Sequence, residues 1–214
     1  MDIETIARTI GVLGIAAIIF AETGLLVGFF LPGDTLLFAA GLLTAQGVLG
    51  INIHAFVLLL TVAAIIGNSA GYAFGARFGR KLFKKPNSAF FSQENLQRAE
   101  KFYEKYGALA VIIGRFTPFV RTFVPIAAGI SKMTYATFTL YNVIGGFLWI
   151  ASVTYIGYYG GNWLHERGIN IEAIVMPVIL AVLLISLASP LYHILANPQK
   201  RQAWLKLSKK SKSE

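Results

Sequence analysis

Four charged side chains lie in segments that are otherwise apolar: Glu22, Asp34, Arg115 and Arg121. Each such residue at a membrane helix centre costs about 2.5–3.5 kcal/mol, so exposing all four to lipid would cost on the order of 10 kcal/mol. They are therefore expected to face protein or water, with two carboxylates opposite two guanidiniums. Because a guanidinium is a planar fork that suits phosphate oxygens and stays charged when desolvated, Arg115 and Arg121 predict a binding site for a phosphate-like anion.

The two carboxylates have a second use in such a site. A carboxylate in a low-dielectric setting changes its proton affinity when an arginine approaches or leaves, so we assign Glu22 and Asp34 to proton coupling. Simpler roles stay open. Asp34 follows Pro-Gly and can cap a helix, Glu22 can sit at the membrane interface, and the arginines can bridge carbonyl groups of a broken helix.

The two segments that carry these charges, residues 22–49 and 107–131, are interrupted by proline. Neither half is long enough to cross a bilayer, which takes about 20 apolar residues. Broken backbone at membrane depth is tolerated when it is buried in protein or lines a wet cavity, so we expect two re-entrant helical hairpins. The breaks and polar side chains expected to line the site are Pro32, Gly33, Pro118, Pro125, Asn68, Thr117 and Thr122.

The two broken segments resemble each other in sequence. One apolar span separates them, so the first is expected to enter the membrane from outside and the second from inside, as an inverted repeat. Transporters built this way bind substrate at the repeat interface near the midplane, where termini of broken helices point their dipoles. A duplicated packing unit without transport is the alternative. The matching stretches are 28–32 with 114–118, 34–35 with 121–122, and 39–41 with 127–129.

The composition predicts a membrane protein. It has 214 residues, of which 56% are hydrophobic and 14% charged, and a mean hydropathy of +0.63. Transmembrane helices are expected at 52–79, 135–163 and 171–196. Residues 1–21 lack the basic region and cleavage site of a signal peptide, so they predict a retained helix. We expect one all-α, polytopic membrane domain over residues 1–196.

The net charge of +9 is concentrated in a loop and in the C-terminal tail. Basic residues mark the cytoplasmic side of a membrane protein and attract anionic lipids, so residues 80–106 and the tail 197–214 are expected to be cytoplasmic, in the cell (inner) membrane. Within the loop, residues 92–106 show an amphipathic pattern typical of an interfacial helix. Lipids and protons are the expected partners, nucleic acid is not, and homo-oligomerisation and the orientation of the N-terminus stay open.

Metal, cofactor and hydrolase chemistry have little support in the sequence. There is no cysteine and the three histidines are scattered, which predicts no metal site and no cofactor. Gly67-Asn68-Ser69-Ala70-Gly71 matches the G-x-S-x-G nucleophile elbow, so an intramembrane serine hydrolase using Ser69 is a remote alternative. That motif requires a strand, a sharp turn and a helix. Here Gly67, Gly71, Gly75 and Gly79 continue a four-residue stripe that predicts helix packing, and we expect no enzyme.

Glu22, Phe-Leu-Pro-Gly-Asp at 30–34 and Gly-Arg-Phe-Thr-Pro-Phe-Val-Arg-Thr at 114–122 resemble the motifs of the DedA family, also called SNARE-associated or VTT-domain proteins. The resemblance covers roughly residues 22–163. It implies a flippase for an anionic lipid phosphate, with undecaprenyl phosphate the foremost candidate, and a phospholipid scramblase or proton-coupled ion antiporter as alternatives. It also implies that the two acids act in proton coupling and the two arginines in activity. The lipid itself stays open.

Overall fold

The computed structural model describes residues 3–24, 33–79, 93–117 and 120–167. All regular structure in these ranges is helical, which confirms the all-α class. The predicted span at 171–196, the tail at 197–214 and the prolines at 32 and 118 lie outside them. The elements are α1 (Ile3–Gly24), α2 (Gly33–Ala45), α3 (Ile53–Phe78), α4 (Gln93–Tyr106), η3 (Gly107–Leu109), α5 (Ala110–Ile113), η4 (Gly114–Phe116), α6 (Val120–Ile130) and α7 (Tyr135–Glu166).

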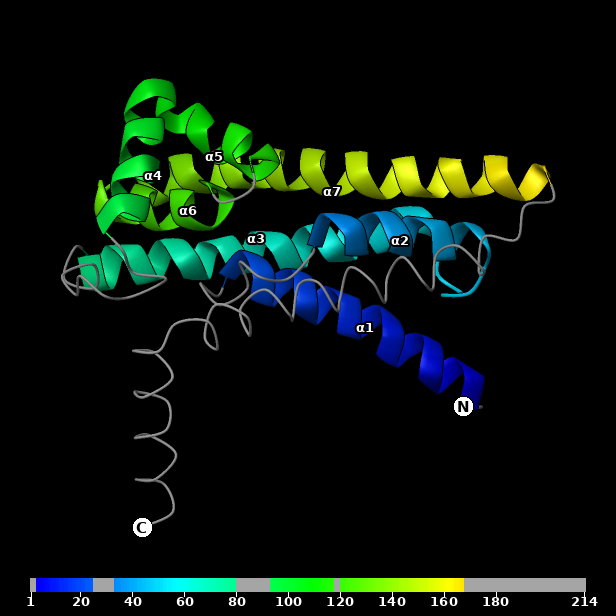
Figure 1. Cartoon of the computed structure of the whole chain (residues 1–214). Coiled ribbons are helices and arrows are strands. Elements are labelled where there is room, and N and C mark those ends of the chain that lie inside the picture. Colours follow the sequence, from blue (N-terminus) through cyan, green and yellow to red (C-terminus); the bar gives the residue numbers. More distant parts are fainter. Residues whose placement is uncertain (1–2, 25–32, 80–92, 118–119, 168–214) are drawn as a thin grey trace, which may run out of the picture.

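Two long helices, α3 and α7, run side by side and form the frame on which the other elements pack (Figure 1). By length and composition, Ile53–Phe78 and Tyr135–Leu164 can each cross a membrane. The start of α3 is fixed by Asn52, whose side-chain oxygen accepts a hydrogen bond from the His54 backbone N–H at 2.9 Å. The helix ends at Gly79, whose φ of 56° favours glycine.

Each of the short helices α2 and α6 packs against the long helix of the other half of the chain. Helix α2 lies along α7 and α6 lies along α3 (Figure 1). A Cβ at Gly41 would lie 2.2 Å from the Thr154 carbonyl oxygen, and one at Gly129 would lie 2.3 Å from that of Tyr72, so only glycine permits these backbone contacts. Each short helix therefore depends on the other half's long helix, and the inverted repeat itself stays a prediction. Re-entry into a bilayer stays a prediction.

The glycine stripe of α3 is a packing surface, as the sequence predicts. At Gly67 a Cβ would lie 2.1 Å from Thr23 Oγ1 of α1, and at Gly75 it would lie 2.3 Å from the Ile126 carbonyl oxygen of α6. The prediction is wrong at Gly79, where a Cβ would meet nothing within 4 Å. That residue ends the helix because its left-handed backbone suits glycine.

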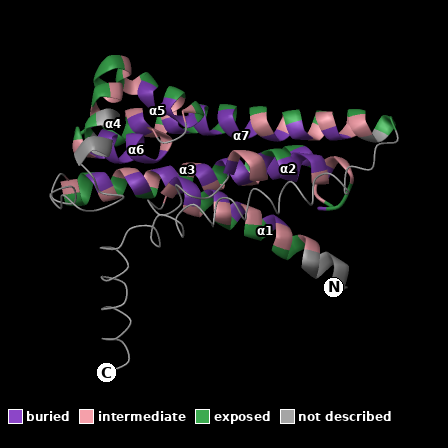
Figure 2. Ribbon diagram, viewed as in Figure 1, coloured by how far each residue is buried: buried purple, intermediate pink, exposed green. Residues whose placement is uncertain are grey.

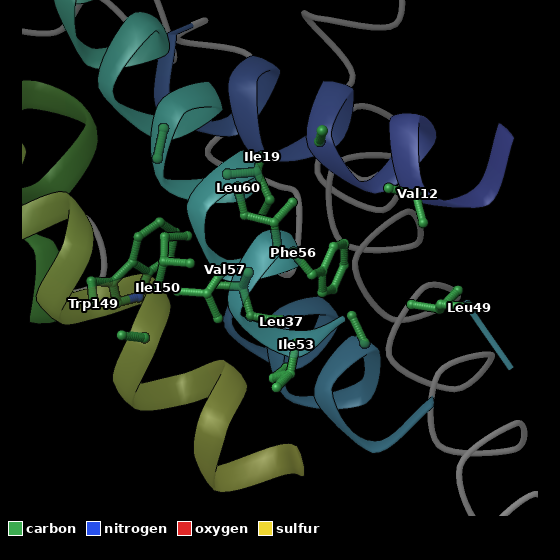
Figure 3. Packing of buried hydrophobic residues seen from close by; sticks show 14 residues of the cluster. Val12, Ile19, Leu37, Leu49, Ile53, Phe56, Val57, Leu60, Trp149 and Ile150 are labelled. Atoms are coloured by element: carbon green, nitrogen blue, oxygen red, sulfur yellow. The ribbon is translucent and has the colours of Figure 1, made fainter. Parts of the chain in front are cut away.

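A buried apolar cluster joins α1, α2, α3 and α7 (Figure 3). This cluster includes Trp149 and so supports the site described below. The outward sides of the long helices are instead exposed (Figure 2). They carry large apolar side chains, and exposed apolar stripes of this kind suit contact with lipid tails. Among those exposed are Leu58, Val62, Ile66, Leu140, Val143, Ile144, Phe147, Leu148 and Ile156.

The predicted amphipathic segment forms helix α4. Its aromatic side chains Phe102, Tyr103 and Tyr106 pack against a buried cluster contributed by α5, α6 and α7. Lys101 and Lys105 remain exposed. Protein therefore covers part of the apolar side of α4, while its location at a membrane interface stays a prediction.

Candidate functional site

The structure brings the four charged residues together where the ends of four elements meet. Glu22 lies near the end of α1 and Asp34 at the start of α2. Arg115 lies in η4 and Arg121 at the start of α6. Because α2 and α6 both begin here, the N-terminal ends of these two helices lie at the same site, each carrying a partial positive charge from its backbone N–H groups.

Arg121 is the cation that holds both acids. Its Nη1 donates to both carboxylate oxygens of Asp34 at 2.9 Å, and its Nη2 donates to Glu22 Oε1. The Glu22 side chain is only 2% exposed, whereas that of Asp34 is 48% exposed. The ion pair with Glu22 is thus largely removed from solvent, and the one with Asp34 is screened on one side.

Arg115 is held by neutral groups, which differs from the expected pairing of two acids with two arginines. The residue is 2% exposed. Its Nη2 donates to Asn142 Oδ1 at 2.7 Å and to the Ala64 carbonyl oxygen at 3.3 Å. No carboxylate of the described residues lies within ion-pair distance of it. Its Nη1 is buried and has no hydrogen-bond partner among the described residues, so one N–H group of a buried cation is left unsatisfied.

Trp149 links the two arginines. The guanidinium carbons of Arg115 and Arg121 lie 5.6 and 5.2 Å from the centre of its ring, within cation–π range. Its Nε1 donates to Asp34 Oδ1 at 2.7 Å. This side chain of α7 is 1% exposed and lies within the apolar cluster of Figure 3. It therefore fixes the spacing of three of the four charged groups.

A small cavity lies between the charged groups, with about 10 Å³ open to a water-sized sphere. That is room for about one water molecule, so a phosphate group does not fit in this arrangement. Glu22 Oε2, which faces the Gly33 backbone, is buried without a hydrogen bond of standard geometry. In this arrangement the cavity is too small for an anion larger than a water molecule. The lining residues are Glu22, Thr23, Asn68, Arg115, Arg121 and Thr122.

Comparison with known proteins places the chain in a family. The VTT-domain family model matches residues 31–159. The chain belongs to the VTT-domain (DedA) family. That span includes Asp34 and both arginines, while Glu22 precedes it. The resemblance seen in the charged motifs is therefore confirmed.

Three relatives show how far the similarity extends. Protein DedA of Escherichia coli K12 is 48% identical over 145 residues, which cover 68% of this chain and 66% of DedA. Inner membrane protein YqjA of the same organism is 36% identical over 189 residues, 85% of each chain. A membrane protein of Mycobacterium tuberculosis is 39% identical over 178 residues, 82% of this chain and 77% of the relative. This DedA-family chain is accordingly a membrane protein. No solved structure matches it.

The remaining predicted site residues of this DedA-family chain divide into two groups. Asn68 and Thr122 are buried and line the cavity. Gly33 packs so closely on Glu22 that a Cβ there would lie 1.6 Å from Oε2.

Thr117 is not among the cavity-lining residues and donates to the Ile113 carbonyl oxygen at 3.3 Å. Pro125 lies inside α6 and does not line the cavity. The binding and coupling roles stay predictions.

Sequence reasoning missed two central residues, Asn142 and Trp149. Both lie within the apolar segment 135–163, which the sequence identified only as a span. Asn142 is fully buried, and a polar amide at that depth requires hydrogen-bond partners. The amide in an otherwise apolar span was therefore a usable signal, whereas a tryptophan in a membrane helix is too common to have been one.

Ser69 does not have the setting of a nucleophile elbow. It lies in the interior of α3, without the strand and sharp turn that the motif requires. Its Oγ accepts a long hydrogen bond from Asn142 Nδ2 at 3.4 Å. His54 is paired instead with the Tyr155 hydroxyl at 2.6 Å. This geometry disfavours the hydrolase alternative.

Proposed function

We propose that the protein is a flippase that moves an anionic lipid phosphate, undecaprenyl phosphate foremost, across the cytoplasmic membrane in a proton-coupled cycle. The observation that carries this proposal is the buried guanidinium of Arg115, which has a free Nη1 and neutral partners. A buried cation that forms no ion pair and keeps an N–H group without an acceptor is costly. A phosphate oxygen would supply the missing acceptor through a charge-assisted hydrogen bond.

The two helix starts add to the attraction for an anion. Helices α2 and α6 begin beside the cavity, and N-terminal N–H groups favour negative charge. At α2 this position already holds Asp34. At α6 the first turn carries Arg121 and Thr122, both of which line the cavity. A phosphate entering between Arg115 and α6 would thus meet two guanidiniums and a hydroxyl.

Glu22 and Asp34 would couple this binding to protons. Protonation of Glu22 removes one anionic partner of Arg121, so part of that guanidinium becomes available to a phosphate oxygen. Deprotonation after release restores the ion pair. A proton that crosses 100 mV supplies about 2.3 kcal/mol. This corresponds to roughly a 40-fold concentration ratio, which is sufficient to give lipid movement a direction.

The proposal is tested with purified protein in liposomes that contain undecaprenyl phosphate. Lipid exposed on the outer leaflet is measured with a membrane-impermeant phosphatase, with and without an imposed pH gradient. We expect the protein to accelerate lipid movement, and the gradient to accelerate it further. A rate that does not respond to the gradient would favour a scramblase.

The matched variants distinguish phosphate binding at the site from an effect of the overall positive charge. The double variant Arg115→Ala, Arg121→Ala is expected to fall to the rate of protein-free liposomes. Arg167→Ala removes an exposed arginine that lies over the Trp163 ring, away from the cavity, and is expected to behave as the unmodified protein. Unchanged transport by the double variant would overturn the proposed binding role.

A further inference from the structure

We propose that Asn68 and Asn142 form a neutral cradle for Arg115, which fixes the guanidinium by hydrogen bonds and leaves its positive charge available to the phosphate. The inference rests on the proposed function and assigns two positioning residues to the same site. Neither amide needs to touch the phosphate for this role.

Both amides direct an oxygen at Arg115. Asn142 Oδ1 accepts from Nη2 at 2.7 Å. The Asn68 amide is oriented by its neighbours, since the opposite orientation would turn its oxygen toward the Thr23 carbonyl oxygen. With its oxygen toward Arg115, it accepts from Nη2 at 3.0 Å and from Nε at 3.3 Å, and its nitrogen donates to the Thr23 carbonyl at 3.3 Å. This orientation replaces the hydrogen bond from Asn68 Nδ2 to Asn142 Oδ1 and places the two amide oxygens 3.1 Å apart, with Arg115 Nη2 donating to both. The cradle therefore holds Nη2 and Nε, and Nη1 stays free.

The cradle is anchored to the helices that frame the site. Asn142 Nδ2 donates to the Ile65 carbonyl oxygen at 3.0 Å, which turns the amide oxygen toward Arg115 and joins α7 to α3. Asn142 and Asn68 are 0% and 3% exposed, so neither amide is free to reorient into solvent. The amide geometry is thus set by backbone groups, independently of any ligand.

Two glycines of α7 let the arginine reach this position. At Gly145 a Cβ would lie 2.9 Å from the Ile112 Cα, so the backbone of α5 touches α7 directly. At Gly146 a Cβ would lie 3.4 Å from Arg115 Nη2. The contact at Gly146 is ordinary van der Waals contact, so only a side chain that extends beyond Cβ would press on the guanidinium, while Gly145 permits the close approach of α5 that carries η4 and Arg115 to the amides.

An amide and a carboxylate beside a buried arginine differ in the net charge that remains at the site. A carboxylate beside a buried arginine would form a stronger pair and would neutralise the charge, as Glu22 and Asp34 do for Arg121. An amide oxygen satisfies an N–H group and contributes no net charge. A site that must bind an anion gains from this choice, because no carboxylate of the described residues forms an ion pair with Arg115 that the incoming phosphate would have to displace.

A purely structural role for the amides predicts a different response to Asn142→Asp. This change keeps the side-chain size and an oxygen acceptor for Arg115 but loses the Nδ2 donor to the Ile65 carbonyl oxygen. A structural contact would tolerate the new charge and show only that loss, as a lower melting temperature. A cradle would not, because the new carboxylate neutralises the guanidinium. We expect farnesyl phosphate, titrated against purified protein in detergent at pH 7, to bind the Asn142→Asp variant about 10- to 100-fold more weakly than the unmodified protein.

Three comparisons make the outcome decisive. Asn162→Asp adds the same charge to α7 about 30 Å further along the helix and is expected to leave binding unchanged. Thermal melting without ligand reports whether each variant is folded. If Asn142→Asp does not fold, Asn68→Asp is measured in its place, with the same expectation. Unimpaired binding by a folded variant of either kind overturns the cradle.

A pH comparison separates charge from shape. At pH 5 a larger fraction of the introduced carboxyl is protonated, so the affinity of Asn142→Asp relative to the unmodified protein is expected to recover. Glu22 and Asp34, the other acids of the described residues at this site, are present in both proteins, so the ratio removes their common effect and retains only their coupling to the new carboxyl. A ratio that stays constant with pH would overturn the charge argument. If the unmodified protein itself binds no farnesyl phosphate, the proposed function fails first and the cradle with it.

Discussion

Arg115 and Arg121 lie against the same tryptophan ring and are held in opposite ways. Arg121 meets two carboxylates, one deeply buried and one half-exposed. Arg115 is more deeply buried than Arg121 and meets amide and carbonyl oxygens. The difference teaches that two residues of one type in the same repeat need not share a task. Arg121 forms ion pairs with two acids of the protein. Arg115 forms none with the described residues, and its Nη1 has no hydrogen-bond partner among them.

The largest effect is expected for Arg121→Ala. Removal of this cation leaves Glu22 buried without a counter-charge, which costs roughly 3–5 kcal/mol, and we expect the lower end, about 3 kcal/mol, because Asp34 is half-exposed. The free energy of unfolding in detergent measures the loss. Adding Glu22→Gln is expected to restore most of it, and an additive double variant would remove the ion-pair explanation.

Arg115→Lys sharpens the comparison through transport. Lysine keeps the charge but not the planar fork that contacts both amides, so we expect lipid phosphate movement to slow about tenfold, or roughly 1.4 kcal/mol. Arg121→Lys, which still presents a charge to two carboxylates, is expected to lose less. A larger loss from Arg121→Lys in the liposome assay would reverse the roles assigned to the two arginines.

Trp149→Phe tests whether the ring mainly stabilises Asp34 or Arg115. Phenylalanine keeps an aromatic face but loses the Nε1 hydrogen bond to Asp34, which should lower the free energy of unfolding by about 1 kcal/mol. The effect should shrink in an Asp34→Asn background and persist in an Arg115→Lys background. Equal coupling to both positions would show that the ring does not distinguish them.

The smallest effect is expected for Ser69→Ala. The hydrogen bond from Asn142 to Ser69 is long, at 3.4 Å, so its loss should change the free energy of unfolding by less than about 0.5 kcal/mol. Transport should be unchanged, because the Ile65 carbonyl still orients Asn142. Abolished activity with intact folding would instead revive the hydrolase alternative.

Much of the frame was predictable because it follows from local pattern. The apolar stretches at 52–79 and 135–163 match α3 and α7 closely, since length and hydropathy are properties of contiguous residues. The packing role of Gly67 and Gly75 followed from their spacing. Gly79 has the same spacing but lies at the helix end, where the pattern carries no information about the cap.

The site was predictable only in part. Isolated charges in apolar segments identified Glu22, Asp34, Arg115 and Arg121 as groups that need partners, although Asp34 is half-exposed. Spacing did not reveal which acid meets which arginine, because those contacts join residues 87 and 99 positions apart. Nor did it reveal Asn142, whose role depends on the neighbouring α3 backbone.

The sequence by itself determined that this is a membrane protein of helices with a repeated, proline-broken motif and charges that cannot face lipid. Those properties come from composition and from residues close together along the chain. Only the tertiary structure decided that Arg121 takes both carboxylates while Arg115 rests on neutral amides. The physical reason is that a buried charge selects its partners by distance and geometry across helices, and these are fixed when α1, α2, α6 and η4 meet on the α3–α7 frame.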